Sequence, residues 1–216
     1  MKGAIIYISS NRETPEFEYK IIEDMMSKKG DMVVYAVTQE PMEDVFEFNW
    51  WVGDVGTSGF NFCRQLQMAL MEAVAADYVI SCEADCLYSP DYFKFVPSKL
   101  DRVYRNTNNY VLPYQSDSFY SKESQTAFQV AGREFLLDRL NYLLKDQPLW
   151  DTEMKNFPKE IGKPFLEDWD NFRTKYACFG IKTGRGMRKQ TRHGKEKFTE
   201  LPYWGTVKQV REKYLI

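Results

Sequence analysis

The fold is decided by the stretch ADYVISCEADCLYSPDYF, residues 76–93. Its apolar part, residues 78–82, is rich in β-branched side chains and too short to form a helix. Such a run is typical of a strand that is buried on both faces of a sheet. We therefore predict that residues 78–82 form a central strand of an α/β fold.

Two carboxylates follow this strand. Glu83 and Asp85 are two residues apart, so on an extended chain their side chains point the same way, at the strand end where open α/β sheets bind ligands. Adjacent acids repel each other unless a cation or hydrogen-bond donors lie between them, and oxygen ligands favour Mg²⁺ or Mn²⁺. We expect a metal site here. The alternative is two solvated acids at a strand end, with Asp91 capping the next turn.

The apolar strand, the acid triplet Glu83-Ala84-Asp85 and the aromatic turn after it resemble the signature of the GT-A glycosyltransferases, especially their family 2-like members. Those enzymes carry Asp-x-Asp, so this chain departs from the pattern at its first acid. The resemblance implies a Mn²⁺ or Mg²⁺ cofactor and a nucleotide-sugar donor, with a UDP-sugar favoured. By the same resemblance Asp85 is the stronger metal ligand, while Glu83 contacts the donor ribose or the metal.

The resemblance also implies a domain organisation. Residues 1–216 would form a single Rossmann-like GT-A domain of the α/β class, with a mostly parallel central sheet flanked by helices. The donor half would cover about residues 1–100, and the acceptor half with a basic C-terminal loop about residues 101–216. A length of 216 residues suits one compact domain.

The first third of the chain predicts a βαβ unit. Residues 3–8 and 32–37 are apolar enough for strands, and between them a helix begins at Thr14-Pro15 and is stopped by Gly30. Two strands joined in this way are parallel and connected by a right-handed crossover. The loop after the first strand should then lie at the ligand-binding edge of the sheet.

Resemblance assigns that loop to the donor nucleotide, and an ordinary strand–helix loop is the alternative. The loop residues assigned to the donor in this way are Ser9, Ser10, Asn11 and Glu13. Residues 39–59 look less regular, and their Gly56–Gly59 run lacks the Lys-Ser or Lys-Thr of a P-loop. A helix is predicted over residues 61–76, where resemblance makes Gln65 and Arg64 donor-pocket candidates; a surface role is the alternative for Arg64.

The second half of the chain mixes strands and helices. We predict a strand over residues 103–112 interrupted by Asn106–Asn109, a polar loop over residues 115–125, and a last strand over Tyr176–Ile181. A helix should follow Gly132, whose missing side chain would allow close approach of an acceptor by analogy with GT-A enzymes. A short helix ending near residue 214 should pack the tail down.

A late acidic motif, residues 165–170, contains the candidate catalytic base. Inverting family 2 enzymes carry a Glu-Asp pair beside an aromatic residue, and Asp168 matches that pair best, with Glu167 next. A carboxylate close to a sugar hydroxyl can remove its proton and so activate it as a nucleophile. The alternative is a pair of acids in the first turn of a short helix, stabilised by the helix dipole. Whether the reaction inverts or retains stays open.

Residues 182–197 form a basic loop with seven Lys and Arg residues and with His193, the one histidine of the chain. Resemblance assigns His193 to the metal or the diphosphate, with a structural role as the alternative, and assigns Arg188 and Arg192 to the donor diphosphate. Seven cations exceed what one diphosphate needs, so a second anionic partner is conceivable. Some small virus-encoded enzymes of this type glycosylate hydroxymethylated DNA; a modified DNA and a saccharide are therefore the two acceptor classes that we consider.

Composition limits the classes of function that the chain can have. A net charge of −2 and a pI near 5.6 argue against nucleic-acid binding through the overall field. The four cysteines are expected to be free thiols, and no apolar run is long enough to span a bilayer, so we expect a cytoplasmic protein, in the host cytoplasm if the chain is viral. Two rival functions remain: a nucleotidyltransferase, and a non-enzymatic nucleic-acid binder acting through the basic loop.

Overall fold

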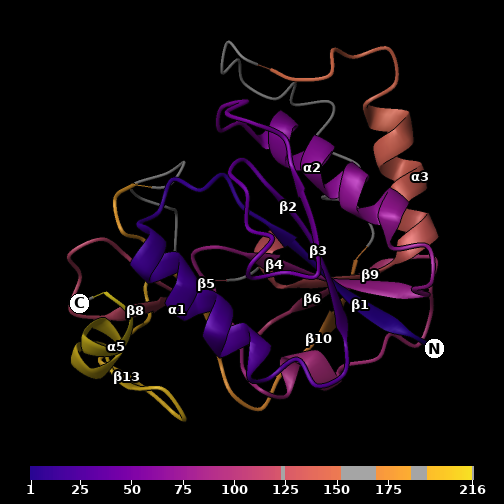
Figure 1. The fold of residues 1–216 in the computed structure, drawn as a ribbon. Helices are drawn as coiled ribbons and strands as arrows, with labels where there is room; N and C mark the ends of the chain where they lie inside the picture. Colours follow the sequence, from indigo (N-terminus) through magenta and orange to yellow (C-terminus); the bar gives the residue numbers. More distant parts are fainter. Residues whose placement is uncertain (123–124, 152–168, 186–193, 216) are drawn as a thin grey trace.

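The computed structural model describes residues 1–122, 125–151, 169–185 and 194–215, and its centre is a seven-stranded sheet of order β10-β6-β9-β4-β1-β2-β3 (Figure 1). All of these strands except β9 run in one direction. The predicted α/β class with a mostly parallel central sheet is therefore confirmed. The strands are β1 (Gly3–Ile8), β2 (Val33–Thr38), β3 (Phe48–Trp51), β4 (Tyr78–Glu83), β6 (Val103–Asn106), β9 (Gln129–Gly132) and β10 (Trp169–Phe172).

The predicted βαβ unit is present. Helix α1 (Pro15–Met26) joins β1 to the parallel strand β2, and the side chain of Thr14 caps it by accepting a hydrogen bond from the backbone N–H of Phe17. The helix ends at Met26, and Gly30 lies in the following turn with a φ of 60°, a conformation that glycine adopts without strain.

Helices cover both faces of the central sheet. Alternate β1 residues point to opposite faces, so Ile5 and Tyr7 pack on the same side as α1, and Ile6 and Ile8 on the side of α2 (Gly59–Glu72) and α3 (Arg133–Leu143). Figure 1 shows α2 and α3 side by side on one side of the sheet and α1 on the other. Each face thus has its own apolar core.

A second sheet has five strands in the order β12-β8-β7-β11-β5. Its core packs against α1 and against α5 (Val207–Tyr214), the predicted C-terminal helix. Its strands are β5 (Cys86–Leu87), β7 (Asn109–Leu112), β8 (Phe119–Ser121), β11 (Cys178–Ile181) and β12 (Lys197–Phe198). The remaining described elements are the hairpin β13 (Glu200–Leu201) and β14 (Gly205–Thr206) and two 3-10 turns, η1 (Tyr92–Lys94) and η2 (Thr126–Phe128).

The prediction of one interrupted strand over residues 103–112 is wrong. β6 belongs to the central sheet and β7 to the second sheet, so the chain changes sheets within Asn106–Asn109. β10 and β11, which pair in parallel with β6 and β7, make the same change. The side-chain amide of Asn106 donates to Thr174 Oγ1 over 2.9 Å and so ties the two crossings together.

Several boundaries also differ from the predictions. Residues 39–59 contain β3, and the supposed polar loop 115–125 contains β8, whose Phe119 is fully buried. α2 ends at Glu72 rather than at residue 76, and β11 is not the last strand, because β12, β13 and β14 follow it among the described residues. Asp91 precedes η1 without capping it; its carboxylate accepts a hydrogen bond from the backbone N–H of Lys175 instead.

Gly132 allows a close approach, but to the chain itself. A Cβ atom at this position would lie 1.7 Å from the backbone carbonyl oxygen of Leu100. The absence of a side chain therefore lets residue 100 pack against the end of β9. Gly132 therefore makes room for the chain itself, whereas the sequence analysis expected it to make room for an acceptor.

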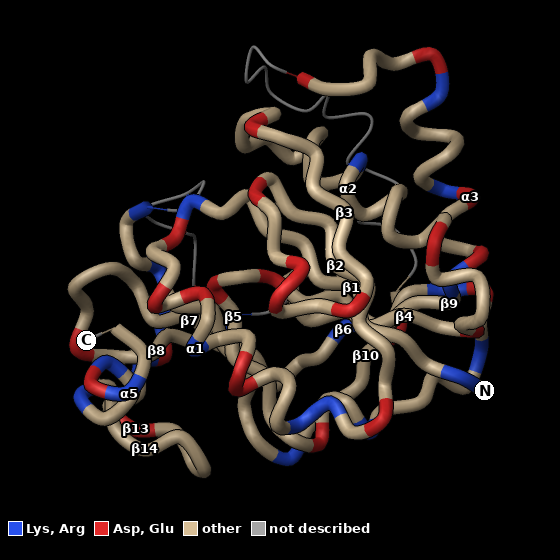
Figure 2. The backbone as a smooth tube through the Cα atoms, viewed as in Figure 1, with Lys and Arg blue, Asp and Glu red and all other residues tan. Residues whose placement is uncertain are grey.

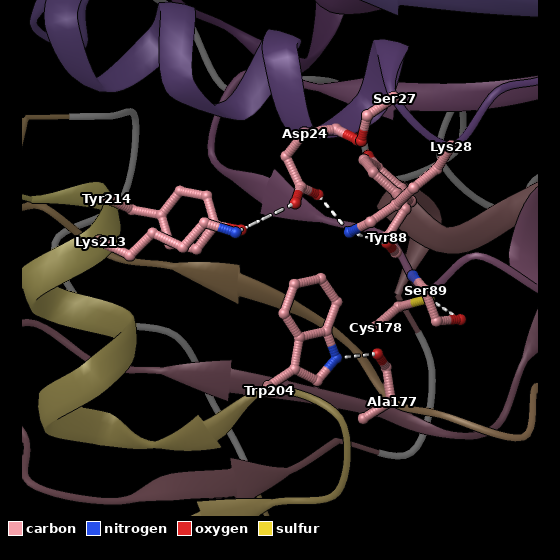
Figure 3. A network of polar contacts seen from close by, with 10 residues as sticks. All are labelled: Asp24, Ser27, Lys28, Tyr88, Ser89, Ala177, Cys178, Trp204, Lys213 and Tyr214. Atoms are coloured by element: carbon pink, nitrogen blue, oxygen red, sulfur yellow. Dashed lines mark hydrogen bonds and ion pairs between the residues drawn. The ribbon is translucent and has the colours of Figure 1, made fainter.

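A buried ion pair at the end of α1 contacts residues of the C-terminal region. Lys28 Nζ lies 2.5 Å from Asp24 Oδ2, donates to the Tyr88 carbonyl oxygen over 3.0 Å, and sits 4.2 Å from the centre of the Trp204 ring (Figure 3). The Tyr214 hydroxyl donates to Asp24 Oδ1 over 2.8 Å. The end of α1 is thereby held by two aromatic residues from the C-terminal region.

The four cysteines are buried free thiols, as predicted. Within the described ranges, none of the helices combines the length and the apolar character that a membrane crossing requires.

Candidate functional site

The site lies where β1 and β4 end side by side. Ile8, the last residue of β1, is paired in register with Glu83, the last residue of β4. The loop that follows β1 and the turn that follows β4 therefore leave the sheet at the same edge. This juxtaposition of the predicted donor loop and the acid triplet is the one expected for a parallel sheet.

The acid triplet forms a compact cluster. One carboxylate oxygen each of Glu83 and Asp85 and the Cys86 sulfur all lie within 4.8 Å of one another. Burial raises the pKa of Glu83 to about 7, and the negative charge of Asp85 contributes to the rise. The structure thus brings Glu83 and Asp85 together, at a position where added positive charge would be favourable.

A lysine from a distant strand already faces this cluster. Lys182, directly after β11, places its Nζ 2.5 Å from Asp85 Oδ2, and the two side chains are 20% and 16% exposed. Burial, the largest single effect, lowers the pKa of Lys182, but the charge and hydrogen bond of Asp85 together with Cys86 and Glu83 outweigh it, so the pKa is raised. Lys182 is therefore a firmly protonated counter-ion of Asp85.

The loop after β1, which is the predicted donor loop, contacts the same segment. Thr183 donates its hydroxyl to Glu13 Oε2 over 2.5 Å. Burial raises the pKa of Glu13, and the charge of Asp85 contributes, although the hydrogen bond from Thr183 opposes the rise. Asp85 pairs directly with the Lys182 ammonium group, and the carboxylates of Glu13 and Glu83 interact with it electrostatically.

The donor atoms of the cluster suit a hard divalent ion. Burial raises the pKa of Cys86 well above its ordinary value, so Cys86 stays a thiol and donates weakly to Asp85 Oδ1 over 3.3 Å. A thiol is a poor metal ligand, which leaves two carboxylates as the ligands, and carboxylate oxygens favour Mg²⁺ or Mn²⁺ over zinc. The carboxylates fit the expected ion, with Lys182 competing for one of them.

The other predicted donor residues mainly hold the loop in place. Ser9 is buried, and its carbonyl oxygen accepts a hydrogen bond from Gln65 Nε2 over 2.9 Å. Asn11, with a φ of 51°, accepts at Oδ1 from the backbone N–H groups of Gln39 and Glu40. Ser10 between them is half-buried. Gln65 therefore holds the loop after β1 through the Ser9 carbonyl oxygen, and Asn11 connects this loop to the residues that follow β2.

Arg64 is more than a surface residue. Its guanidinium group donates to the carbonyl oxygens of Leu144, Gln147 and Pro148 at 2.9–3.0 Å. These carbonyls lie at and beyond the end of α3, so Arg64 joins the end of this helix to α2.

Several predicted site residues lie outside the described residues. They are the candidate base residues Glu167 and Asp168, the diphosphate candidates Arg188 and Arg192, and the metal candidate His193. Arg185, in the described part of the basic loop, is exposed.

Sequence reasoning missed the role of two residues. It grouped Lys182 with the basic loop and gave no role to Tyr88, whose hydroxyl accepts from the backbone N–H of Glu83 over 2.8 Å. One signal was available for Lys182: it directly follows a buried strand, as Glu83 and Asp85 follow theirs. Elsewhere, Figure 2 shows acidic and basic residues interspersed along the described backbone.

Comparison with known proteins identifies the fold. No protein-family model and no curated protein sequence matches the chain. Among solved structures, S. aureus TarS 1–349 aligns with a TM-score of 0.51 and 13% identity over 84% of this chain and 61% of that chain. A longer S. aureus TarS structure gives a TM-score of 0.50 and 12% identity over 85% of this chain and 37% of that one.

A third match is a glycosyltransferase involved in the glycosylation of the major capsid of PBCV-1. It aligns with a TM-score of 0.46 and 11% identity over 79% of this chain and 81% of that chain. TarS is a GT-A-like glycosyltransferase, and this chain spans less than two thirds of the TarS structures. The chain therefore has a GT-A-like fold.

Proposed function

We propose that the protein is a metal-dependent glycosyltransferase that moves a sugar from a nucleotide-diphosphate sugar to an acceptor hydroxyl. The observation that carries the proposal is the carboxylate pair Glu83 and Asp85 at the end of β4, beside the loop that ends β1, on a GT-A-like fold. The raised pKa of Glu83 supports it, because strongly shifted acids cluster at functional sites.

Different residues at the sheet edge would contact different parts of the donor. Asp85 and Glu83 would hold Mn²⁺ or Mg²⁺, and the bound ion would neutralise charge on the departing diphosphate. The loop from Ser9 to Glu13 would border the nucleotide, with Asn11 and Gln65 keeping that loop in shape. Lys182 would add a second positive charge beside the diphosphate.

The acceptor side of the proposal rests on the sequence. Asp168, or Glu167 beside it, would accept the proton of the acceptor hydroxyl, and His193, Arg188 and Arg192 would complete the donor site. The proposal keeps both acceptor classes, a saccharide and hydroxymethylated DNA. For a DNA acceptor the rate should fall steeply with salt, because each neutralised phosphate releases a counter-ion.

The test is a panel of nucleotide sugars with and without Mn²⁺, read by thermal shift and followed by product analysis. A donor at one hundred times its dissociation constant adds roughly 2.7 kcal/mol to the unfolding free energy. That gain raises the melting temperature of a chain of this size by roughly 5–10 °C. Release of the nucleoside diphosphate together with a glycosylated acceptor supports the proposal.

Other outcomes point to the rivals. Release of pyrophosphate from a nucleoside triphosphate and a sugar phosphate would identify a nucleotidyltransferase. Salt-dependent binding of nucleic acid, with no response to any nucleotide sugar or to Mn²⁺, would identify a non-enzymatic binder.

A further inference from the structure

The position of Lys182 sets a condition on ion binding at the acid cluster. Its Nζ lies 2.5 Å from Asp85 Oδ2, within direct hydrogen-bond distance. A divalent ion bound to Asp85 in the same direction would occupy the space of this ammonium group and would meet its positive charge at close range. The two cations therefore compete for that direction of approach to Asp85 Oδ2.

The backbone around Lys182 is fixed, but its side chain can move. The Lys182 N–H donates to the Leu112 carbonyl oxygen over 2.9 Å, and the Ile181 N–H donates to the Asp85 carbonyl oxygen over 2.7 Å. These bonds hold the lysine beside the acids whatever its side chain does. A four-carbon stem with a compact ammonium group can change partners by rotation alone.

From this geometry we infer that Lys182 is a built-in counter-ion that competes with the divalent ion for Asp85, and that it moves onto the donor diphosphate when the ion binds. The inference rests on the ion-binding part of the proposed function. Before the ion binds, Lys182 holds Asp85 in place and offsets the repulsion from Glu83. Once displaced, the ammonium group remains near the site, where a diphosphate is the natural partner for it.

The competition has a consequence for coupling between ligands. In the wild-type protein a nucleoside diphosphate draws Lys182 away from Asp85, so it raises the affinity for the ion by more than its own coordination of the ion would. By reciprocity the ion raises the affinity for the diphosphate by the same factor. Without Lys182 this extra coupling disappears.

The experiment measures binding of MnCl₂ by the electron paramagnetic resonance signal of free Mn²⁺, so no sugar transfer is required. We expect Lys182→Met to bind Mn²⁺ at least tenfold more tightly than the wild type, and Lys182→Arg, which keeps the charge, to stay within threefold of it. Lys195→Met is the matched control, because it removes one charge from an exposed position of the basic loop, and it should change the affinity less than twofold.

Two further measurements make the result specific. The double variant Lys182→Met, Asp85→Asn should lose the gain in affinity, which locates the ion at Asp85. Addition of UDP should raise Mn²⁺ affinity by a larger factor in the wild type than in Lys182→Met. Unchanged or weaker Mn²⁺ binding by Lys182→Met, or no Mn²⁺ binding by either protein, overturns the inference. Absence of sugar transfer with the tenfold gain intact overturns only the proposed function.

Discussion

Two lysine–aspartate pairs in this protein have the same 2.5 Å separation and different surroundings. Lys28 and Asp24 are 7% and 8% exposed, and the pair contacts the Tyr88 carbonyl, the Tyr214 hydroxyl and the Trp204 ring. Lys182 and Asp85 are 20% and 16% exposed and lie beside a second carboxylate, Glu83. The first pair is complete, whereas the second is open to a further ligand.

The pKa shifts of the two lysines express the same difference. Burial lowers the pKa of Lys28 despite its partner Asp24, whereas the acids around Lys182 outweigh burial and raise its pKa. A surplus of negative charge thus remains at the sheet edge and not at the end of α1. We conclude that the Asp24 pair stabilises the fold, and we propose that the Asp85 pair belongs to a binding site.

The largest effect that we expect is on stability at the Asp24 pair. Lys28→Met leaves the Asp24 carboxylate buried without its nearest cation, so the free energy of unfolding should fall by about 3 kcal/mol. Urea denaturation measures the change. Lys213→Met is the matched control: Lys213 approaches the same carboxylate at 3.9 Å but is 67% exposed, so its loss should cost less than about 1 kcal/mol. Equal losses from both variants would contradict the distinction between the two pairs.

A comparable effect should appear at the Asp85 pair, but in ligand binding. Asp85→Asn should remove the melting-temperature increase of roughly 5–10 °C that saturating Mn²⁺ and donor produce in the wild type. Its unfolding free energy in EDTA should change by less than half as much as that of Lys28→Met. Glu83→Gln should lose less of the ligand-induced increase, if Glu83 contacts the ribose. A full ligand-induced increase in Asp85→Asn would exclude the carboxylate pair as the ion site.

A smaller effect is expected from the hydroxyl that completes the Asp24 pair. Tyr214→Phe removes one hydrogen bond to a buried carboxylate, which should lower the unfolding free energy by about 1.5 kcal/mol. Tyr142→Phe removes a hydroxyl from a residue that is 79% exposed and should have no measurable effect. If the two variants unfold alike in urea, the Asp24 pair is not closed in the way described.

The smallest effect is a pH dependence. Because the pKa of Lys28 is lowered in the folded protein, the unfolded chain binds more protons between that value and the ordinary pKa of lysine. Stability attributable to Lys28 should therefore rise with pH in that window. The unfolding free energy of the wild type minus that of Lys28→Met should increase as the pH rises toward about 10.4, the ordinary pKa of lysine. A decrease over this range would mean that pairing with Asp24 outweighs burial.

The sequence predicts much of the central sheet because the information is local there. The strand that carries Glu83, the βαβ unit and its Thr14 cap all follow from apolar periodicity and capping within about a dozen residues. The meeting of Glu83 with the donor loop follows as well, since parallel strands end at the same edge. These elements are correct in the structure to within a few residues.

Contacts between distant residues could not be predicted. Lys182 and Asp85 are 97 positions apart, and their meeting depends on the pairing of β11 with β5, a strand of two residues. The change of sheets at Asn106 likewise depends on Thr174, 68 positions away. Polar residues inside an apolar run are typical of an interrupted strand, and no local signal distinguishes that from a crossing between two sheets.

The covering of the Asp24–Lys28 pair by C-terminal residues affects when this part of the protein can fold during translation. Trp204 and Tyr214, which contact this pair, are translated about 180 residues after Asp24 and Lys28. At roughly 5–20 residues per second the pair remains in water for at least about nine seconds of synthesis. The end of α1 can reach its final environment only after nearly all of the described chain has been translated, so nascent chains stopped before residue 204 should keep this end of the helix accessible to proteases.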